Sequence, residues 1–260
     1  MAKLTVADIQ KMKRDGVKIA AAITYDYQQA QILDRAGMDI LTVGDSIGRN
    51  RFGQLTHHET SVDLMVLACG AVSRGAKRAL VNCDMPFGPP QEGPDAAVRA
   101  AIRLVKEGRA EMVKIDNAVA SIDSVRAIVK TGIPVWTQFG FSPQSTLKIG
   151  SFDNVTAEDA NRERKRILEE ARMLEEIGAS LLDLTHVKNP EIYTEVSRTV
   201  SIPVLGGSSH AGPEADGRIS GFTYSVANLD GEPRHGLNLA KVMYDGAQVY
   251  ITAVREARRY

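Results

Sequence analysis

Cysteine is nearly absent from this 260-residue chain, which contains only Cys69 and Cys83. A disulfide framework or a thiolate metal site needs more cysteines in a suitable pattern, so neither is expected, and both thiols are predicted to be buried. No stretch approaches 18 consecutive apolar residues, and the first 14 residues lack the apolar core of a signal peptide. The composition therefore predicts a cytoplasmic protein without a membrane segment.

An excess of either charge is also missing. Thirty-two basic residues balance 32 acidic ones, without a long run of either sign, so neither nucleic acid nor a membrane surface is an expected partner. The glycine patterns of dinucleotide and P-loop sites are absent. Small polar molecules remain as ligands. The backbone amides of residues 206–209, Gly-Gly-Ser-Ser, could bind an anion or simply form a sharp turn.

Apolar runs alternate with amphipathic segments along the whole chain. Strands are expected at 18–25, 39–45, 79–84, 111–116, 133–138, 179–185, 201–205 and, least clearly, 219–225. Helices are expected at 5–14, 27–35, 59–75, 95–107, 118–130, 156–177, 189–198 and 237–259, with loops at 49–58 and 140–154. Without a linker-like break, this alternation predicts one (β/α)8 TIM barrel over residues 1–260, with a short N-terminal helix. A doubly wound open sheet is the alternative.

Three acids stand at the ends of three expected strands: Asp45, Asp84 and Asp116. If the strands are parallel, their carboxyl ends meet on the face where α/β folds bind ligands. Carboxylate oxygens suit Mg2+, and a metal ion that polarises a 2-oxo group stabilises the resulting enolate. Lys114 would add positive charge beside that oxyanion. For each acid, a helix cap or a structural ion pair is the alternative.

A set of uncommon motifs follows in order along nearly the whole chain. They are Thr24-Tyr25-Asp26-Tyr27, Val43-Gly44-Asp45-Ser46, Arg74-Gly75-Ala76, Asp84-Met85-Pro86-Phe87-Gly88, Val113-Lys114, Ser142-Pro143-Gln144-Ser145 and Asp216-Gly217. In these motifs the chain resembles the ketopantoate hydroxymethyltransferases (3-methyl-2-oxobutanoate hydroxymethyltransferases) of pantothenate biosynthesis. That family lies within the phosphoenolpyruvate mutase and isocitrate lyase superfamily. The resemblance implies a barrel enzyme that assembles into a large homo-oligomer, a decamer in the family.

The resemblance also implies a reaction and a set of site residues. A 2-oxo acid, 2-oxoisovalerate or an analogue, would be enolised with Mg2+ and would receive a one-carbon unit from 5,10-methylenetetrahydrofolate. By the matching positions, Asp45 and Asp84 would hold the metal and, with Ser46 and Lys114, the substrate. Asp116 stands where the family has a third acid, a glutamate, near the metal. Its side chain is one methylene shorter and would extend less far towards the metal or its water.

The residue expected to move the substrate proton departs from the family. Thr185 stands where the family has a catalytic glutamate, and Gln138 replaces a family histidine. Threonine cannot act as a general base near neutral pH. Asp183 precedes Thr185 by two residues and so shares its inward face, while His186 carries an imidazole but is expected to point outward. These two are the candidate catalytic replacements, with His210 as a third.

Two other functions stay open at this point. The same site could cleave a C–C bond of a 2-oxo acid or decarboxylate it, which needs no base at the position of Thr185. Alternatively, the chain could be a non-catalytic paralogue that binds metal and oxo acid without turnover. The segment 206–212 is more polar than its family counterpart. A different substrate tail or one-carbon donor, in a secondary-metabolite pathway, is therefore a further alternative.

Overall fold

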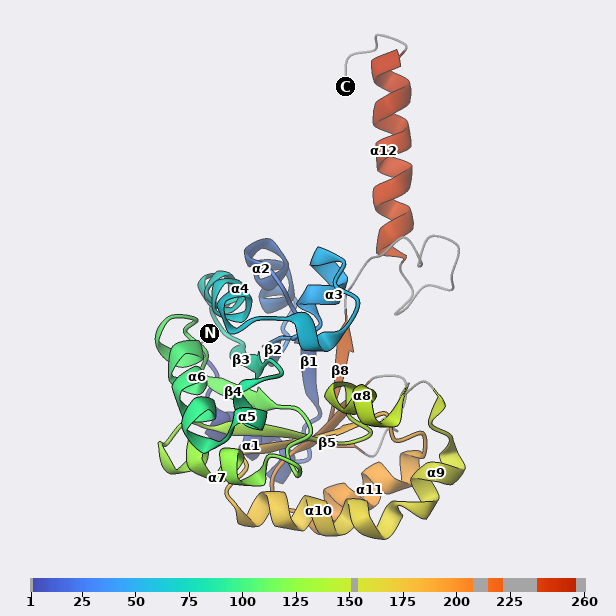
Figure 1. Ribbon diagram of the computed structural model, residues 1–260. Helices are drawn as coiled ribbons and strands as arrows, with labels where there is room; N and C mark the ends of the chain where they lie inside the picture. The colour runs from blue at the N-terminus through green and yellow to red at the C-terminus, as the bar shows by residue number, and fades with distance from the viewer. Residues whose placement is uncertain (1, 151–153, 208–214, 222–237, 256–260) are drawn as a thin grey trace. The chain divides into compact units, whose positions relative to one another are not determined.

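Eight parallel strands, paired in chain order, close into a barrel (Figure 1). The computed structural model describes residues 2–150, 154–207, 215–221 and 238–255. The strands are β1 Ile19–Ile23, β2 Ile40–Val43, β3 Leu80–Met85, β4 Met112–Ile115, β5 Val135–Gly140, β6 Leu181–Thr185, β7 Val204–Gly207 and β8 Gly217–Gly221. The predicted (β/α)8 barrel is confirmed. The open-sheet alternative is wrong, because β8 pairs with β1.

Helices alternate with the strands, and those within residues 2–207 surround the barrel (Figure 1), while one more helix follows β8 in the chain. They are α1 Val6–Arg14, α2 Tyr27–Arg35, α3 Ile47–Phe52, α4 Val62–Gly75, α5 Pro89–Glu92, α6 Pro94–Lys106, α7 Ile122–Lys130, α8 Thr146–Ile149, α9 Ala157–Arg162, α10 Arg164–Glu176, α11 Pro190–Thr199 and α12 Leu239–Arg255, with 3-10 turns η1 His57–Glu59 and η2 Pro143–Ser145. In α6, Ala97, Ala101 and Leu104 recur at helical spacing and are fully buried, so this face packs on the barrel.

The short N-terminal helix α1 closes the amino-terminal end of the barrel. Thr5 and Asp8 form the capping box that their spacing predicts, so the helix begins where expected. Ile9 is fully buried in a cluster to which each of the eight strands contributes one or two of its first three residues. Lys13 fastens the end of the helix: its Nζ donates to the carbonyl oxygens of Ser197, Val200 and Ile202 and pairs with Asp216. Because this end is filled, ligand chemistry belongs at the other end.

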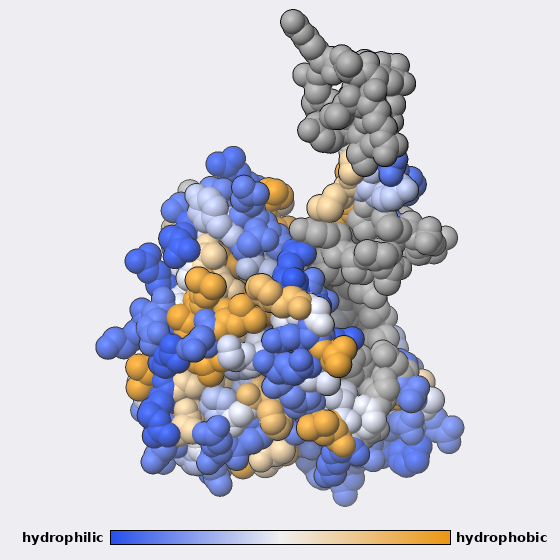
Figure 2. Space-filling model, turned by 45° about the horizontal axis from the view of Figure 1, so that its top comes forward, coloured by the Kyte–Doolittle hydropathy of each residue, from blue (hydrophilic) through white to orange (hydrophobic). Residues whose placement is uncertain are grey.

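The chain divides into two units, Met1–Gly221 with the whole barrel and Phe222–Tyr260 with α12. The prediction of a single domain over residues 1–260 therefore stays a prediction. No helix in the part of the chain described is long and apolar enough to cross a membrane. Figure 2 shows apolar areas between charged ones on the barrel unit. Among the exposed apolar side chains are Ile32 and Leu67, on the packed helices α2 and α4.

Several local predictions need correction. The expected loop 49–58 contains the end of α3 and the start of η1, and the expected loop 140–154 contains η2 and α8. These helices have three to six residues, too few for a helical period to show in the sequence. The expected helix 156–177 is two helices, because Glu163 ends α9 and its N–H turns back to the carbonyl oxygens of Asp159 and Asn161. The eighth strand begins earlier, at Gly217, and residues 222–225 lie outside the described part.

Both cysteines are where the sequence placed them. Cys69 lies in α4 and Cys83 in β3, and both are free and buried. Burial raises the pKa of the Cys83 thiol, with its neighbour Cys69 adding to the shift. Both thiols are therefore packing residues in the core rather than reactive groups.

Candidate active site at the carboxyl end of the barrel

The lysine of the candidate site lies between two carboxylates. Pairing of β3 with β4 places Asp84 directly beside Lys114. Lys114 Nζ is 2.6 Å from Asp183 Oδ2 on β6 and 3.9 Å from Asp84 Oδ2, and it lies 5.0 Å from the centre of the Trp136 ring. Lys114 and Asp183 are almost fully buried. The barrel interior thus holds a fixed ammonium group with a carboxyl group on both sides.

Burial and the neighbouring charges act in opposite directions on these groups. For Lys114, burial disfavours the charged form, but Asp183 and Asp84 outweigh it and raise the pKa. For Asp84, burial raises the pKa to about 7, Lys114 opposes the shift, and the charge of Asp45 adds to it. Lys114 is therefore a permanent cation near neutral pH. Asp84 is poised to give up its proton when a second cation arrives.

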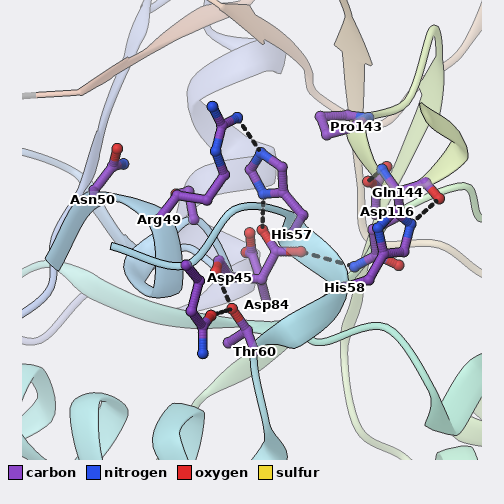
Figure 3. Close-up of polar contacts among 12 residues, drawn as sticks. Asp45, Arg49, Asn50, His57, His58, Thr60, Asp84, Asp116, Pro143 and Gln144 are labelled. Atoms are coloured by element: carbon purple, nitrogen blue, oxygen red, sulfur yellow. Dashed lines mark hydrogen bonds and ion pairs between the residues drawn. The ribbon is translucent and has the colours of Figure 1, made fainter. Parts of the chain in front are cut away.

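Asp45 follows β2 and is held from two sides (Figure 3). Its Oδ2 accepts from Gln144 Nε2 at 2.8 Å, and its Oδ1 lies 3.3 Å from Nδ1 of His57, whose Nε2 faces Arg49. Arg49 has only N–H groups to offer, which fits the tautomer in which Nδ1–H of His57 donates to Asp45. The backbone carbonyl of Asp45 accepts from Thr60 Oγ1. The carboxylate is therefore oriented before any ligand binds.

Asp116 follows β4 and is held by the loop that comes after β5. Ser142 Oγ and the backbone N–H of Asn117 donate to its Oδ1, and the backbone N–H of Gln144 donates to its Oδ2 at 2.8 Å. Burial, followed by the charge of Asp45, raises the pKa of Asp116 to about 6 against these donors. Asp84 differs in its partners: Thr42 Oγ1 and Asn82 Nδ2 donate to its Oδ1, both at 3.1 Å, while its Oδ2 faces Lys114 at 3.9 Å.

Ser46 is supported by the end of β1. The hydroxyl groups of Ser46 and Tyr25 share a hydrogen bond of 2.8 Å, and Asn50 Nδ2 donates to the same Tyr25 oxygen. Gly44 makes the close approach possible, since a Cβ there would lie 2.7 Å from Ser46 Oγ. In the motif Val43-Gly44-Asp45-Ser46, the glycine therefore leaves the space that the serine hydroxyl occupies.

Asp45, Asp84 and Asp116 lie at the carboxyl ends of the parallel strands β2, β3 and β4, as the sequence pattern predicts, but their roles and those of Lys114 and Asp183 stay predictions. Within residues 2–150, 154–207, 215–221 and 238–255, no group of three or more His, Cys, Asp or Glu side chains is arranged to hold a metal ion. Mg2+ does not require one, because it is commonly bound by one or two carboxylates with water and substrate.

The remaining sequence predictions concern β6 and the loop after β7. Thr185 is the last residue of β6, and His186 follows with a φ of 53°, in the left-handed region. His186 thus leaves the strand alternation from which its outward direction was expected. Gln138 is buried on β5, paired in register with Asp183. His210 and two of the four residues of the possible anion loop lie outside the described residues.

Several residues whose side chains contact the acids were not predicted to do so, among them Thr42 and Asn82, which donate to Asp84, and His57 and Gln144, which contact Asp45. His57 lies in a segment expected to be an ordinary loop, and no pattern in the sequence indicated it. Gln144 belongs to the quoted motif Ser142-Pro143-Gln144-Ser145, which signalled importance without revealing its partners. His57 comes from the segment 12 residues after Asp45, whereas Gln144 comes from a segment 99 residues away.

The sequence matches the model of the ketopantoate hydroxymethyltransferase family over residues 3–259. The chain belongs to this family. A relative from Salinibacter ruber named 3-methyl-2-oxobutanoate hydroxymethyltransferase is 35% identical over 98% of this chain and 96% of its own length. One of the same name from Chlorobaculum parvum is 36% identical over 97% of this chain and 92% of its own. The alignment of this ketopantoate hydroxymethyltransferase family member with its relatives therefore includes both the barrel and the candidate site.

Solved structures agree on the fold of this family member. A 2,3-dimethylmalate lyase of the PEP mutase/isocitrate lyase superfamily superposes with a TM-score of 0.63 at 16% identity, over 98% of this chain and 89% of that one. An oxaloacetate acetylhydrolase gives a TM-score of 0.64 at 12% identity, over 98% and 88%. At these identities the likeness concerns the barrel alone.

Proposed function

We propose that this protein transfers a hydroxymethyl group to 2-oxoisovalerate or an analogous 2-oxo acid, with 5,10-methylenetetrahydrofolate as co-substrate and Mg2+ as cofactor. Family membership supports the reaction class, because the curated relatives carry the name 3-methyl-2-oxobutanoate hydroxymethyltransferase. The observation that carries the proposal is the placement of Lys114 3.9 Å from Asp84, with Asp45 near enough to raise the pKa of Asp84.

The charges at the strand ends fit a divalent cation. Asp45, Asp84, Asp116 and Asp183 are four acids with Lys114 as the cation among them, and burial raises the pKa of Asp84 to about 7. Such a cluster is stabilised when a positive ion replaces the proton. The donors are carboxylate oxygens, which Mg2+ prefers. We propose Asp45 and Asp84 as the ligands, with Asp116 beside them or bound through water.

The residues divide the work of enolisation. When bound, Mg2+ would polarise the 2-oxo group and stabilise negative charge on its oxygen. Lys114 would face the oxo acid and add a fixed positive charge, at no cost of reorganisation because Asp183 and Asp84 already hold it in place. Ser46 would bind the substrate carboxylate, with Tyr25 setting the direction of its hydroxyl.

The base that removes the C3 proton stays a prediction, with Asp183 and His186 as candidates. Asp183 is the stronger one by position, but Lys114 Nζ lies only 2.6 Å from its Oδ2. That oxygen is engaged in the ion pair, so the pair would have to open before the carboxylate could take a proton from the substrate. This observation favours a second candidate function, C–C bond cleavage or decarboxylation of a 2-oxo acid, in which no C3 proton has to be removed.

Deuterium exchange separates the two functions. The protein is incubated with 2-oxoisovalerate in D2O and exchange at C3 is followed by NMR, first with Mg2+ and then with a chelator. We expect exchange with Mg2+ that Asp84→Asn abolishes and that the exposed control Asp63→Asn retains. Addition of 5,10-methylenetetrahydrofolate should then yield the hydroxymethylated acid. Absence of both exchange and folate-dependent product would contradict the transferase and direct attention to cleavage of larger 2-oxo acids.

A further inference from the structure

Gln144 connects more of the candidate site than any residue predicted for it. It lies in η2, after β5, and is 4% exposed. Its side chain and backbone contact the ends of three strands: Nε2 donates to Asp45 Oδ2 at 2.8 Å and to the Met85 carbonyl at 3.2 Å, and the backbone N–H donates to Asp116 Oδ2 at 2.8 Å. Its carbonyl oxygen lies 2.9 Å from Nε2 of His58 (Figure 3).

The contacts of the side-chain amide fix which way it points. Asp45 Oδ2 and the Met85 carbonyl are both acceptors, so the NH2 end must face them and the amide cannot be turned over. Gln144 Oε1 then lies on the other side, buried and without a hydrogen-bond partner in the described part of the chain. A buried acceptor without a donor is destabilising. The unpartnered oxygen is a cost in stability that offsets part of the gain from the other hydrogen bonds of Gln144, which points to a role beyond folding.

We propose that Gln144 is a positioning residue that holds the Asp45 carboxylate in the orientation required for cation and substrate binding. The assignment deepens the proposed function and rests on Asp45 being a ligand there. A neutral amide suits this task, because it donates to Asp45 without adding a charge to a cluster that already contains four carboxylates. Its backbone N–H acts on Asp116 at the same time, so one loop residue sets the relative position of two acids.

Gln144→Met tests the role with little change in volume. The substitution removes the donor to Asp45 and also removes the unpartnered Oε1, so these effects on stability oppose each other. We expect the melting temperature of the metal-free protein to change by only a few degrees. The affinity for Mn2+, measured with the metal alone by electron paramagnetic resonance, should fall about 10- to 100-fold, the usual effect of losing a partner that orients a ligand.

Two further variants complete the experiment. Gln144→Asn keeps the amide but draws it back by one methylene, and it should also weaken Mn2+ binding. Thr146→Val, in the same loop, removes a hydroxyl bond to the Pro143 carbonyl without touching an acid. It should bind Mn2+ like the wild type. With 2-oxoisovalerate, the two Gln144 variants should show a lower exchange rate that added Mn2+ partly restores.

The outcomes distinguish this assignment from the function on which it rests. If Asp45→Asn weakens Mn2+ binding while Gln144→Met and Gln144→Asn bind within threefold of the wild type, the role of Gln144 is overturned and the metal site stands. If Asp45→Asn also binds normally, the metal site of the proposed function fails, and the assignment fails with it. A large fall in melting temperature for both Gln144 variants, at unchanged Mn2+ affinity, would make Gln144 a structural residue only.

Discussion

Lys114→Met should destabilise the protein more than Asp183→Asn, although the two residues form one ion pair. Lys114 Nζ is 2.6 Å from Asp183 and 3.9 Å from Asp84. Without the lysine, the buried Asp183 carboxylate and the partly buried Asp84 carboxylate lose their cation. Removing one partner of a buried pair in this way costs about 3–5 kcal/mol in the free energy of unfolding.

Asp183→Asn should cost less because Lys114 keeps other partners. The Asp84 carboxylate and the ring of Trp136, 5.0 Å away, still face the ammonium group, and the new amide oxygen can accept its hydrogen bond. The substitution also removes a charge that helps to raise the pKa of Asp84. Losing a hydrogen bond between charged groups costs about 1.5–3 kcal/mol. We therefore expect a difference of about 2 kcal/mol between the variants.

Urea unfolding at pH 8 with a chelator, followed by circular dichroism, measures this difference at unchanged m value. Lys165→Met is the matched control, since the Lys165 side chain is 90% exposed and its nearest acid, Glu169, is 3.8 Å away. The control should stay within about 0.5 kcal/mol of the wild type. An Asp183→Asn variant as unstable as Lys114→Met would refute the view that Lys114 is shared between two acids.

Three other predictions concern single positions. In metal-free protein the free energy of unfolding should fall as pH rises from about 4 to 7, because burial raises the folded-state pKa of Asp84 to about 7 and the unfolded state releases its proton earlier. Urea titrations of Asp84→Asn should show a flatter slope. Gly140 has a φ of 99°, and a Cβ there would lie 2.8 Å from the Thr185 carbonyl oxygen on β6, so Gly140→Ala should lower the free energy of unfolding by ~2–3 kcal/mol in thermal melts. Gly150→Ala is the control, since a Cβ there meets no atom within 4 Å, and it should lower the free energy of unfolding by only ~1 kcal/mol. Ile9→Ala should cost ~2–5 kcal/mol, and exposed Ile32→Ala almost nothing.

The fold was largely predictable because its elements repeat a strong local pattern. The bounds of α2 coincide with the predicted helix 27–35, and β6 ends at Thr185 as predicted. Short apolar runs followed by glycine or an acid mark the strand ends. Eight such strands alternating with helices are compatible with few folds other than a (β/α)8 barrel. Helices such as α3 and η1 carry no such pattern, since their conformation depends on contacts such as that between Thr60 and Asp45.

The site was predictable where its residues lie on strands and unpredictable where loops complete it. Asp45, Asp84 and Lys114 could be placed together because parallel strands end on one face. The pairing of Lys114 with Asp183 could not, since β4 and β6 are not neighbours and the contact crosses the barrel interior. Gln144 lies 99 residues from Asp45 in sequence. Its contact depends on the conformation of the loop after β5, which no local pattern determines.

The closure of the amino-terminal end by α1 also bears on how such a chain can change during evolution. Ile9 and Lys13 secure the fold at the end opposite Asp45 and Asp84, without contact to the acids. Substitutions among the loops at the carboxyl end can therefore alter substrate preference while the closed end preserves stability. In a barrel arranged in this way, the binding site at one end can change while the packing at the other end retains the fold.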